Sequence, residues 1–199
     1  MAGPGKCILV TGPPGVGKST LIMRVFEGLK TSNPNLKVQG FYTLEEFSGE
    51  VRQGSERIGF EVVTLDGRIG SLASANISSG RPESRRWPNV GKYRVDIASF
   101  ESLALPELQV REDTDLFIID EVGKLELYSS SFFPAVLKVL ESNIPILASI
   151  PIPKYGRDIP EVARLRNHPT ADIYTLSLSN RDAVREEIRS LLVDLLRKH

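Results

Sequence analysis

The stretch C-I-L-V-T-G-P-P-G-V-G-K-S-T, residues 7–20, decides the fold of this chain of 199 residues. Its centre, residues 12–19, matches G-x-x-x-x-G-K-[ST], the phosphate-binding P-loop. The apolar run before the motif predicts a buried strand, and the apolar residues that recur at helical spacing over 18–30 predict a helix. The motif therefore lies between a strand and a helix. A glycine-rich turn with a chance G-K-S, the alternative, does not explain this context.

The residues of the loop suit an anion for separate physical reasons. Glycines let the backbone turn tightly so that its N–H groups point at a phosphate, and the helix N-terminus adds partial positive charge. We expect Lys18 to reach the β- and γ-phosphates and the hydroxyl of Ser19 to hold Mg²⁺. The predicted nucleotide-binding residues are Gly12, Pro13, Pro14, Gly15, Val16, Gly17, Lys18, Ser19 and Thr20.

Two carboxylates follow the apolar run at 116–119, which is typical of a strand covered on both faces. Ligands of open α/β sheets bind beyond the carboxyl ends of the strands, so we expect Asp120 beside the P-loop as a second Mg²⁺ ligand. Glu121 is the predicted general base for an attacking water. A strand end that is simply solvated is the alternative for this pair. Lys124 either stabilises charge on the γ-phosphoryl group or pairs with Glu126 at the surface, and both interpretations stay open.

Composition narrows the class of protein. Lys and Arg together number 25, as do Asp and Glu, so the formal charge is zero and broad nucleic-acid binding is not expected. The one cysteine, Cys7, cannot form an internal disulfide and is predicted to be a small buried hydrophobe. His168 and His199 lie apart from any cysteine or histidine cluster, so no zinc site is predicted. Without a signal peptide or a membrane-spanning run, we expect a cytoplasmic protein with no membrane partner. A monomer is expected as well.

Strands alternate with helices at both ends of the chain. This alternation predicts an α/β fold: a mostly parallel sheet with helices on both faces, in a single domain over 1–199. The expected strands lie at 7–11, 38–43, 115–120, 144–150 and 172–178. The expected helices lie at 18–30, 130–142, 160–166 and 181–197, the last one capped by Asn180.

The middle of the chain has a different character. Residues 44–74 predict an antiparallel β excursion, with a hairpin turn at Asp66-Gly67, and 76–89 is predicted to be a mobile loop. Residues 100–110 favour a helix, although Pro106 is expected to start a new helix rather than lie inside one.

Five motifs together resemble those of the THEP1-type P-loop nucleoside-triphosphatases. They are G-P-P-G-V-G-K-S at 12–19, G-F-Y-T at 40–43, R-I-G-F at 57–60, D-E-V-G-K-L-E at 120–126 and S-N-R at 179–181. The P-loop is generic, whereas D-E-x-G-K-x-E beside G-F-Y-T is much more specific, and the resemblance spans nearly the whole chain. It implies a RecA/AAA-like core and Mg²⁺-dependent hydrolysis of nucleoside triphosphates with loose base preference. The stretches at 45–55 and 81–87 depart from the pattern of the family.

Hydrolysis of ATP, GTP, CTP and UTP is the leading prediction, with Lys18, Glu121 and Lys124 as the catalytic residues. A nucleoside or nucleotide kinase is the first alternative, because the arginine-rich stretch at 81–86 would serve as a lid. The second alternative is a nucleotide-gated switch in which slow hydrolysis only resets binding. Carboxylates at the strand end favour water as the nucleophile, and the chain lacks the Asn-Lys-x-Asp guanine reader of GTPases.

A few further residues allow two interpretations. Arg57 and Arg68 lie near the turns of the excursion, where solvated charges are favoured over phosphate contacts. Phe41 and Tyr42, at a strand end, are more typical of core than of nucleotide contacts. Asn180 and Arg181 are the best candidates near a base, although capping of the last helix explains Asn180 without any ligand.

Overall fold

The computed structural model describes residues 6–48, 55–75 and 86–197. The predicted mobile loop at 76–89 lies outside these residues as far as 85, as do 49–54 and His199. In the described part of the chain, no helix combines the length and the apolar character needed to cross a lipid bilayer.

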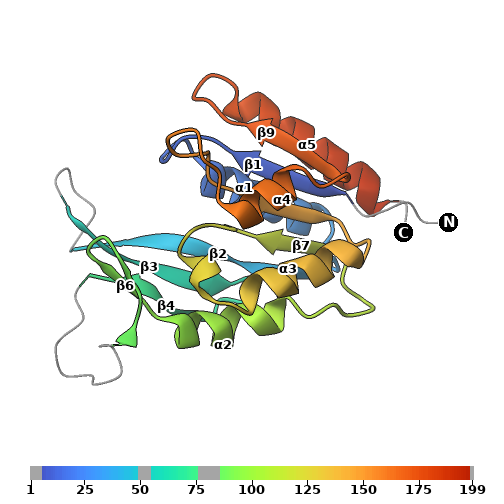
Figure 1. Ribbon diagram of the computed structural model, residues 1–199. Coiled ribbons are helices and arrows are strands. Elements are labelled where there is room, and N and C mark those ends of the chain that lie inside the picture. The colour runs from blue at the N-terminus through green and yellow to red at the C-terminus, as the bar shows by residue number, and fades with distance from the viewer. Residues whose placement is uncertain (1–5, 49–54, 76–85, 198–199) are drawn as a thin grey trace.

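Parallel strands form the half of the sheet that carries the P-loop (Figure 1). Their order is β2-β7-β8-β1-β9, so that one strand separates the P-loop strand β1 from the acidic strand β7. Every residue of β1 is buried, because strands flank it and helices cover both of its faces. The bounds are β1 Cys7–Thr11, β2 Val38–Phe47, β7 Leu116–Ile119, β8 Ile146–Ser149 and β9 Ala171–Thr175.

Antiparallel strands continue the same sheet beyond β2, in the order β3-β4-β6-β5. The long strand β2 joins the two halves, because it pairs with β7 over its first residues and with β3 over the rest. The predicted hairpin turn connects β3 to β4, where the Gly67 N–H donates to the carbonyl of Thr64 at 3.0 Å. The bounds are β3 Arg57–Thr64, β4 Ile69–Ser74, β5 Asn89–Val90 and β6 Tyr93–Val95.

Helices cover both faces of the parallel half, because alternate strand residues point to opposite sides. Helices α1 (Lys18–Ser32) and α5 (Arg181–Leu196) pack on the face that carries Ile8 and Val10. Helices α2 (Ile97–Glu107), α3 (Phe132–Glu141) and α4 (Pro160–Arg166) pack on the face that carries Cys7 and Leu9. The fold is therefore α/β with a mixed sheet.

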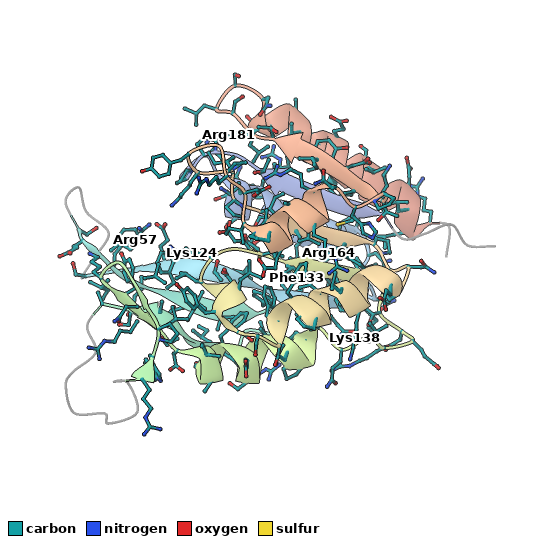
Figure 2. All side chains as sticks on the ribbon, viewed as in Figure 1. Arg57, Lys124, Phe133, Lys138, Arg164 and Arg181 are labelled. Carbon is teal, nitrogen blue, oxygen red and sulfur yellow. The ribbon has the colours of Figure 1, made fainter. Side chains whose placement is uncertain are left out.

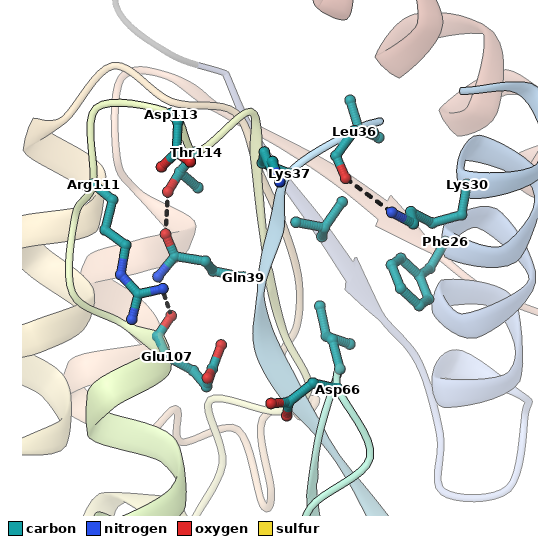
Figure 3. A pocket seen from close by; sticks show the side chains of 12 residues that line it. Phe26, Lys30, Leu36, Lys37, Gln39, Asp66, Glu107, Arg111, Asp113 and Thr114 are labelled. Atoms are coloured by element: carbon teal, nitrogen blue, oxygen red, sulfur yellow. Dashed lines mark hydrogen bonds between the residues drawn. The ribbon is translucent and has the colours of Figure 1, made fainter. Parts of the chain in front are cut away.

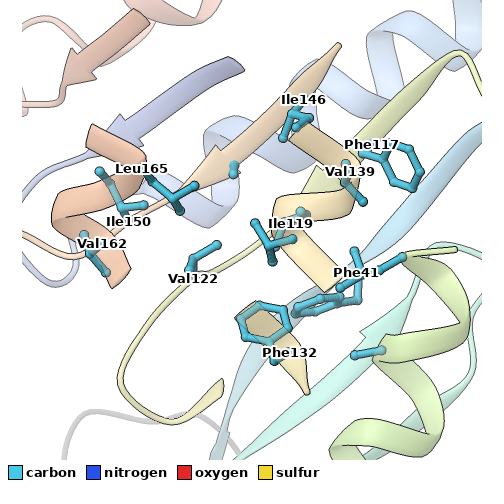
Figure 4. Close-up of a cluster of buried hydrophobic side chains, with 14 of the residues drawn as sticks. Phe41, Phe117, Ile119, Val122, Phe132, Val139, Ile146, Ile150, Val162 and Leu165 are labelled. Carbon is cyan, nitrogen blue, oxygen red and sulfur yellow. The ribbon is translucent and has the colours of Figure 1, made fainter. Parts of the chain in front are cut away.

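An aromatic cluster anchors α2 and α3 to β2. Phe41, Phe100 and Phe132 are all buried, and their ring centroids lie 5.3 to 5.9 Å apart with edge-to-face geometry. Figure 4 shows Phe41 and Phe132 side by side within the larger core. Such pairs add about 0.5–1.5 kcal/mol each beyond the burial of their area. The interpretation of Phe41 as core is confirmed.

Gly40 lets β2 lie against β7 at the start of G-F-Y-T. Gly40 pairs with Ile118 and has a φ of 134°. A Cβ added at this position would lie 1.7 Å from the carbonyl oxygen of Ile118. The parallel pairing next to the acidic strand end therefore requires glycine here.

Helix α2 corrects one expectation. Pro106 lies inside this helix rather than at the start of a new one. The proline is tolerated because the helix ends one residue later, at Glu107, so the missing N–H affects only the last turn. The helix begins at Ile97, earlier than expected, because the Asp96 side chain accepts a hydrogen bond from the Ser99 N–H at 3.0 Å.

Candidate active site

The P-loop connects the end of β1 to the start of α1, as the sequence predicts. Gly15 and Gly17 have φ values of 79° and 105°, a region that favours glycine. Val16 anchors the loop: its side chain is buried, and its N–H donates to the Pro13 carbonyl at 3.2 Å. The tip of the loop is exposed, at Pro13, Pro14 and Gly15, as is Thr20 on the first turn of α1.

Lys18 lies across its own loop. Its ammonium group donates a hydrogen bond to the Gly12 carbonyl at 2.8 Å, and the side chain is partly buried. The positive charge therefore lies within the turn that the glycines make, where an anion would be bound.

Asp120 follows β7 directly and is 1% exposed. Its Oδ1 accepts a hydrogen bond from the hydroxyl of Ser149 at the end of β8, while Oδ2 has no hydrogen-bond partner among the described residues. Burial raises the pKa of this carboxyl, and the nearby Ser149, Ser19 and Lys18 act in the opposite direction. The structure thus brings Asp120, Ser19 and Lys18 together.

The unpartnered oxygen of Asp120 indicates a ligand-binding position, because burying a polar atom without a partner costs free energy. A divalent cation fits these donors, since a carboxylate oxygen and a hydroxyl are both hard ligands. No group of three or more His, Cys, Asp or Glu side chains within 6–48, 55–75 and 86–197 could hold a metal ion. Mg²⁺ does not need such a cluster when phosphate and water complete its shell. His168 instead hydrogen-bonds Thr170 at 2.8 Å.

Glu121 lies beside this group and is largely shielded from water. Burial raises its pKa, the charge of Asp120 adds to the effect, and the charge of Lys18 opposes it. The carboxyl rests against the following backbone, since a Cβ at Gly123 would lie 2.4 Å from Glu121 Oε1. Gly123 therefore leaves room for this side chain, and a larger residue there would make the Glu121 side chain move. In its present position the carboxyl lies close enough to Asp120 and Lys18 to feel both charges.

Glu126 is a third carboxyl of the cluster, and the sequence reasoning missed its burial. It begins the short helix η2 (Glu126–Tyr128) and is 3% exposed. Burial raises its pKa well above the ordinary value, the charges of Glu121 and Asp120 add to this, and the backbone N–H groups of Gly123 and Glu126 itself oppose it. The last residue of D-E-x-G-K-x-E was the available signal.

Lys124 does not pair with Glu126, so that interpretation is wrong. Lys124 is exposed on the loop after β7, whereas Glu126 is buried, and no ion pair engages the lysine in the described ranges (Figure 2). The alternative, a contact with the γ-phosphoryl group, stays a prediction.

Arg57 and Arg68 of the excursion both form ion pairs, one within the excursion and one with the end of α2. Arg57 binds the Glu45 carboxylate at 2.8 Å and lies 4.9 Å above the ring centroid of Phe60. Arg68 binds the Glu107 carboxylate at 2.8 Å. Both side chains are paired rather than simply solvated, and neither contact involves the P-loop.

Asn180 is the N-cap residue of α5, as predicted, but its side chain makes no capping hydrogen bond to the helix. The Asn180 amide instead accepts from the Ser177 N–H at 2.7 Å and donates to the Thr175 carbonyl at 3.0 Å. Arg181, the next residue, extends toward the P-loop: its Nη1 lies 3.8 Å from the position of a Cβ added at Gly17.

A cavity of about 320 Å³ lies at the other edge of the parallel strands, near the start of β2 and the ends of α1 and α2 (Figure 3). Its buried amide, Gln39, already donates to the carbonyls of Glu107 and Gln109, at 3.3 and 2.9 Å. The P-loop edge, by contrast, holds two buried oxygens without a partner among the described residues, Thr11 Oγ1 and Asp120 Oδ2. We therefore place the candidate site at the P-loop.

Known proteins resemble the chain over most of its length. A family profile described as NTPase matches residues 7–189. A cancer-related nucleoside-triphosphatase homolog from Bos taurus is 43% identical over 189 residues, which cover 91% of this chain and 93% of that protein. The solution structure of a human cancer-related nucleoside triphosphatase matches with a TM-score of 0.74 at 39% identity, covering 94% of this chain and 97% of the other. The crystal structure of THEP1 from Aquifex aeolicus matches with a TM-score of 0.73 at 34% identity, covering 94% and 98%.

Proposed function

The chain belongs to the NTPase family, as its motifs predict, and we propose that it hydrolyses ATP, GTP, CTP and UTP to diphosphate and phosphate with Mg²⁺ as cofactor. The observation that carries this proposal is the unpartnered Oδ2 of Asp120, buried close to Ser19 and Lys18 at the P-loop. Asp120 and Ser19 would hold the metal ion, with Ser149 fixing the orientation of the carboxylate. When bound, Mg²⁺ neutralises charge on the β- and γ-phosphate oxygens.

The protein side chains divide the chemical step among them. Glu121 takes a proton from the attacking water as the water oxygen bonds to the γ-phosphorus. The bond from that phosphorus to the bridging oxygen then breaks and releases the diphosphate. Lys18 offsets the charge that develops on the phosphate oxygens, and Lys124 approaches the γ-phosphoryl group from its exposed loop.

Two wider assignments accompany this function. We propose that 1–199 forms one P-loop domain of the RecA/AAA-like division, supported by the single strand β8 between β1 and β7. The cytoplasmic location and the monomeric state stay predictions.

A phosphate-release assay tests the function. We expect free phosphate from all four triphosphates only with Mg²⁺, at efficiencies within about tenfold of one another, or ~1.4 kcal/mol in the transition state. Lys18→Ala should nearly abolish release, and Lys138→Ala, on the exposed face of α3, should not (Figure 2). Transfer of phosphate only to an added acceptor would indicate a kinase instead. A preference above about a thousandfold for one base would contradict the broad specificity.

A further inference from the structure

The loop between β9 and α5, residues 176–180, lies against one end of the P-loop, and Arg181, the first residue of α5, lies near the other end. At the first glycine, a Cβ on Gly12 would lie 3.0 Å from the Leu176 carbonyl oxygen. At the last glycine, the Arg181 guanidinium lies 3.8 Å from the position of a Cβ on Gly17. The Leu176 N–H also donates to the Thr11 carbonyl at 2.8 Å. This loop therefore packs directly against the phosphate cradle.

The shape of this loop is fixed by hydrogen bonds of its own. The Asn180 amide is used on both sides, by the Ser177 N–H and the Thr175 carbonyl, and the Ser177 hydroxyl accepts from the Asn180 N–H at 3.2 Å. Two side chains stay available at the surface. Leu178 is 73% exposed, and within the described part of the chain no hydrogen bond or ion pair engages the Arg181 side chain (Figure 2).

The strand order says which end of a nucleotide would meet this loop. The carboxylates that act at the γ-phosphate follow β7, which lies on the β8 side of β1. Strand β9 and its loop lie on the other side of β1 (Figure 1). With the γ-phosphate held toward Asp120 and Glu121, the nucleoside leaves the cradle on the side of β9, past Gly17 and toward Arg181.

We propose that Arg181 and Leu178 form a platform on which the base of any bound nucleotide stacks without being read by hydrogen bonds. This inference rests on the proposed function for the orientation of the phosphates. A guanidinium plane stacks on every base, because all bases have a π face. The nearest amide that could read a base, Asn180, is already bonded within its loop. The platform thus supplies a physical cause for broad base specificity.

Equilibrium binding separates a base contact from a phosphate contact. Titration calorimetry without divalent cation would give the Kd of ADP, GDP, CDP and UDP, and of inorganic tripolyphosphate, which has no base. Arg181→Ala should raise the Kd of all four nucleotides about fivefold or more and leave that of tripolyphosphate unchanged. Arg185→Ala is the matched control, because this arginine of α5 pairs with Asp182 and Glu186 within its own helix.

The other outcomes overturn the platform. If Arg181→Ala lost affinity for tripolyphosphate as strongly as for the nucleotides, Arg181 would be a phosphate ligand. If affinity fell for one base only, Arg181 would recognise that base. If no affinity were lost, the base would bind elsewhere. Leu178→Ser should weaken nucleotides alone by about twofold or more, and melting curves confirm that each variant is folded. A wild-type protein that binds nucleotides but releases no phosphate would contradict the proposed function and leave the platform standing.

Discussion

Asp120 is held in place before any ligand arrives. The Ser149 hydroxyl binds Oδ1, and the Asp120 N–H donates to the Phe41 carbonyl at 3.1 Å, so the carboxylate is fixed on two neighbouring strands. Preorganised groups of this kind lose little freedom when they bind an ion or a phosphate. Glu121 is not fixed by a strand and rests on the loop backbone at Gly123. The two adjacent carboxylates are therefore suited to different tasks.

Substitutions should separate these tasks. Asp120→Asn should weaken Mg²⁺-dependent nucleotide binding and turnover together, because the metal ion loses its protein carboxylate. Glu121→Gln should bind nucleotide and metal normally but lose turnover by about 10²-fold or more, the scale of a positioned general base. Nucleotide Kd values with and without Mg²⁺, beside single-turnover rates, measure both effects. If both variants lost affinity equally, Glu121 would be a binding residue.

Glu126 should make the stability of the protein depend on pH. Because its pKa is raised in the folded state above the ordinary 4.5, the unfolded chain releases this proton at lower pH than the folded protein does. The contribution of Glu126 to folding stability is then greatest below about pH 4.5 and is lost as pH rises toward the folded pKa. Glu126→Gln should remove this loss and raise the free energy of unfolding at pH 8 by about 1 kcal/mol, an ordinary single-site effect.

Urea titrations at several pH values, without nucleotide, would measure the difference between the two proteins. The difference should shrink as pH falls and disappear below 4.5, where the carboxyl becomes protonated in both states. Glu27→Gln, on an exposed position of α1, is the matched control and should show no such trend. A Glu126→Gln protein that was less stable than wild type at pH 8 would show that the carboxylate is bound favourably as an anion.

The sequence predicts candidate site residues that belong to a recognisable local motif. It does not predict residues that lie near the site only because the chain folds. The P-loop and Asp120-Glu121 are recognisable because each motif is local. Ser149 follows an ordinary apolar run, and nothing in its own segment says that its hydroxyl meets Asp120 from another strand. A surface pairing of Glu126 with Lys124 was one of two open interpretations, and the burial of Glu126 is not predictable locally because a charged side chain is rarely buried.

At the scale of elements, the pairing of β2 with β7 requires a residue without a side chain at position 40. Gly40→Ala would place a methyl group 1.7 Å from the Ile118 carbonyl, so the strands must separate just before Asp120. We expect a loss of about 3 kcal/mol or more in unfolding free energy, with nucleotide binding weakened in the fraction that stays folded. Chemical denaturation measures the first effect and calorimetry the second.

Gly67→Ala separates backbone strain from steric overlap. Gly67 also has a positive φ, 93°, but no atom lies within 4 Å of an added Cβ. The Gly67→Ala protein should lose only about 1–2 kcal/mol of unfolding free energy, the usual cost of a left-handed conformation. Similar losses in the two variants would show that β2 can shift at Gly40 and that the contact with Ile118 is not the limiting one.

The elements themselves were largely predictable, because apolar periodicity reports burial and burial is what the helices and strands share. Their order in the sheet was not. No local sequence pattern predicts that β8 lies between β1 and β7, because the strand order depends on how the helices cover both faces of the sheet. Pro106 was misjudged for a related reason: a proline is as compatible with the last turn of one helix as with the first turn of the next.

At the scale of the whole molecule, the two halves of the sheet differ in what they contribute. The parallel half carries every proposed nucleotide, metal and catalytic residue beyond the ends of its strands. In the antiparallel half, Arg57 pairs with Glu45 of β2, and Arg68 pairs with Glu107 at the end of α2. The parallel half is also the one that is covered on both faces. The candidate site is therefore built on the part of the molecule with the most continuous core.

Because Cys7 is buried, the rate at which its thiol is chemically labelled reports how often the protein opens transiently. This lone cysteine of the chain is 1% exposed in β1, and burial, aided by the charge of Asp172, raises the pKa of its thiol to about 12. Iodoacetamide should react only in molecules in which β1 has separated from its neighbouring strands, so the labelling rate measures how often such openings occur. Nucleotide at 100 times its Kd should slow labelling about a hundredfold, because it binds only the closed protein. A labelling rate that does not change with nucleotide would show that the opening is confined to β1.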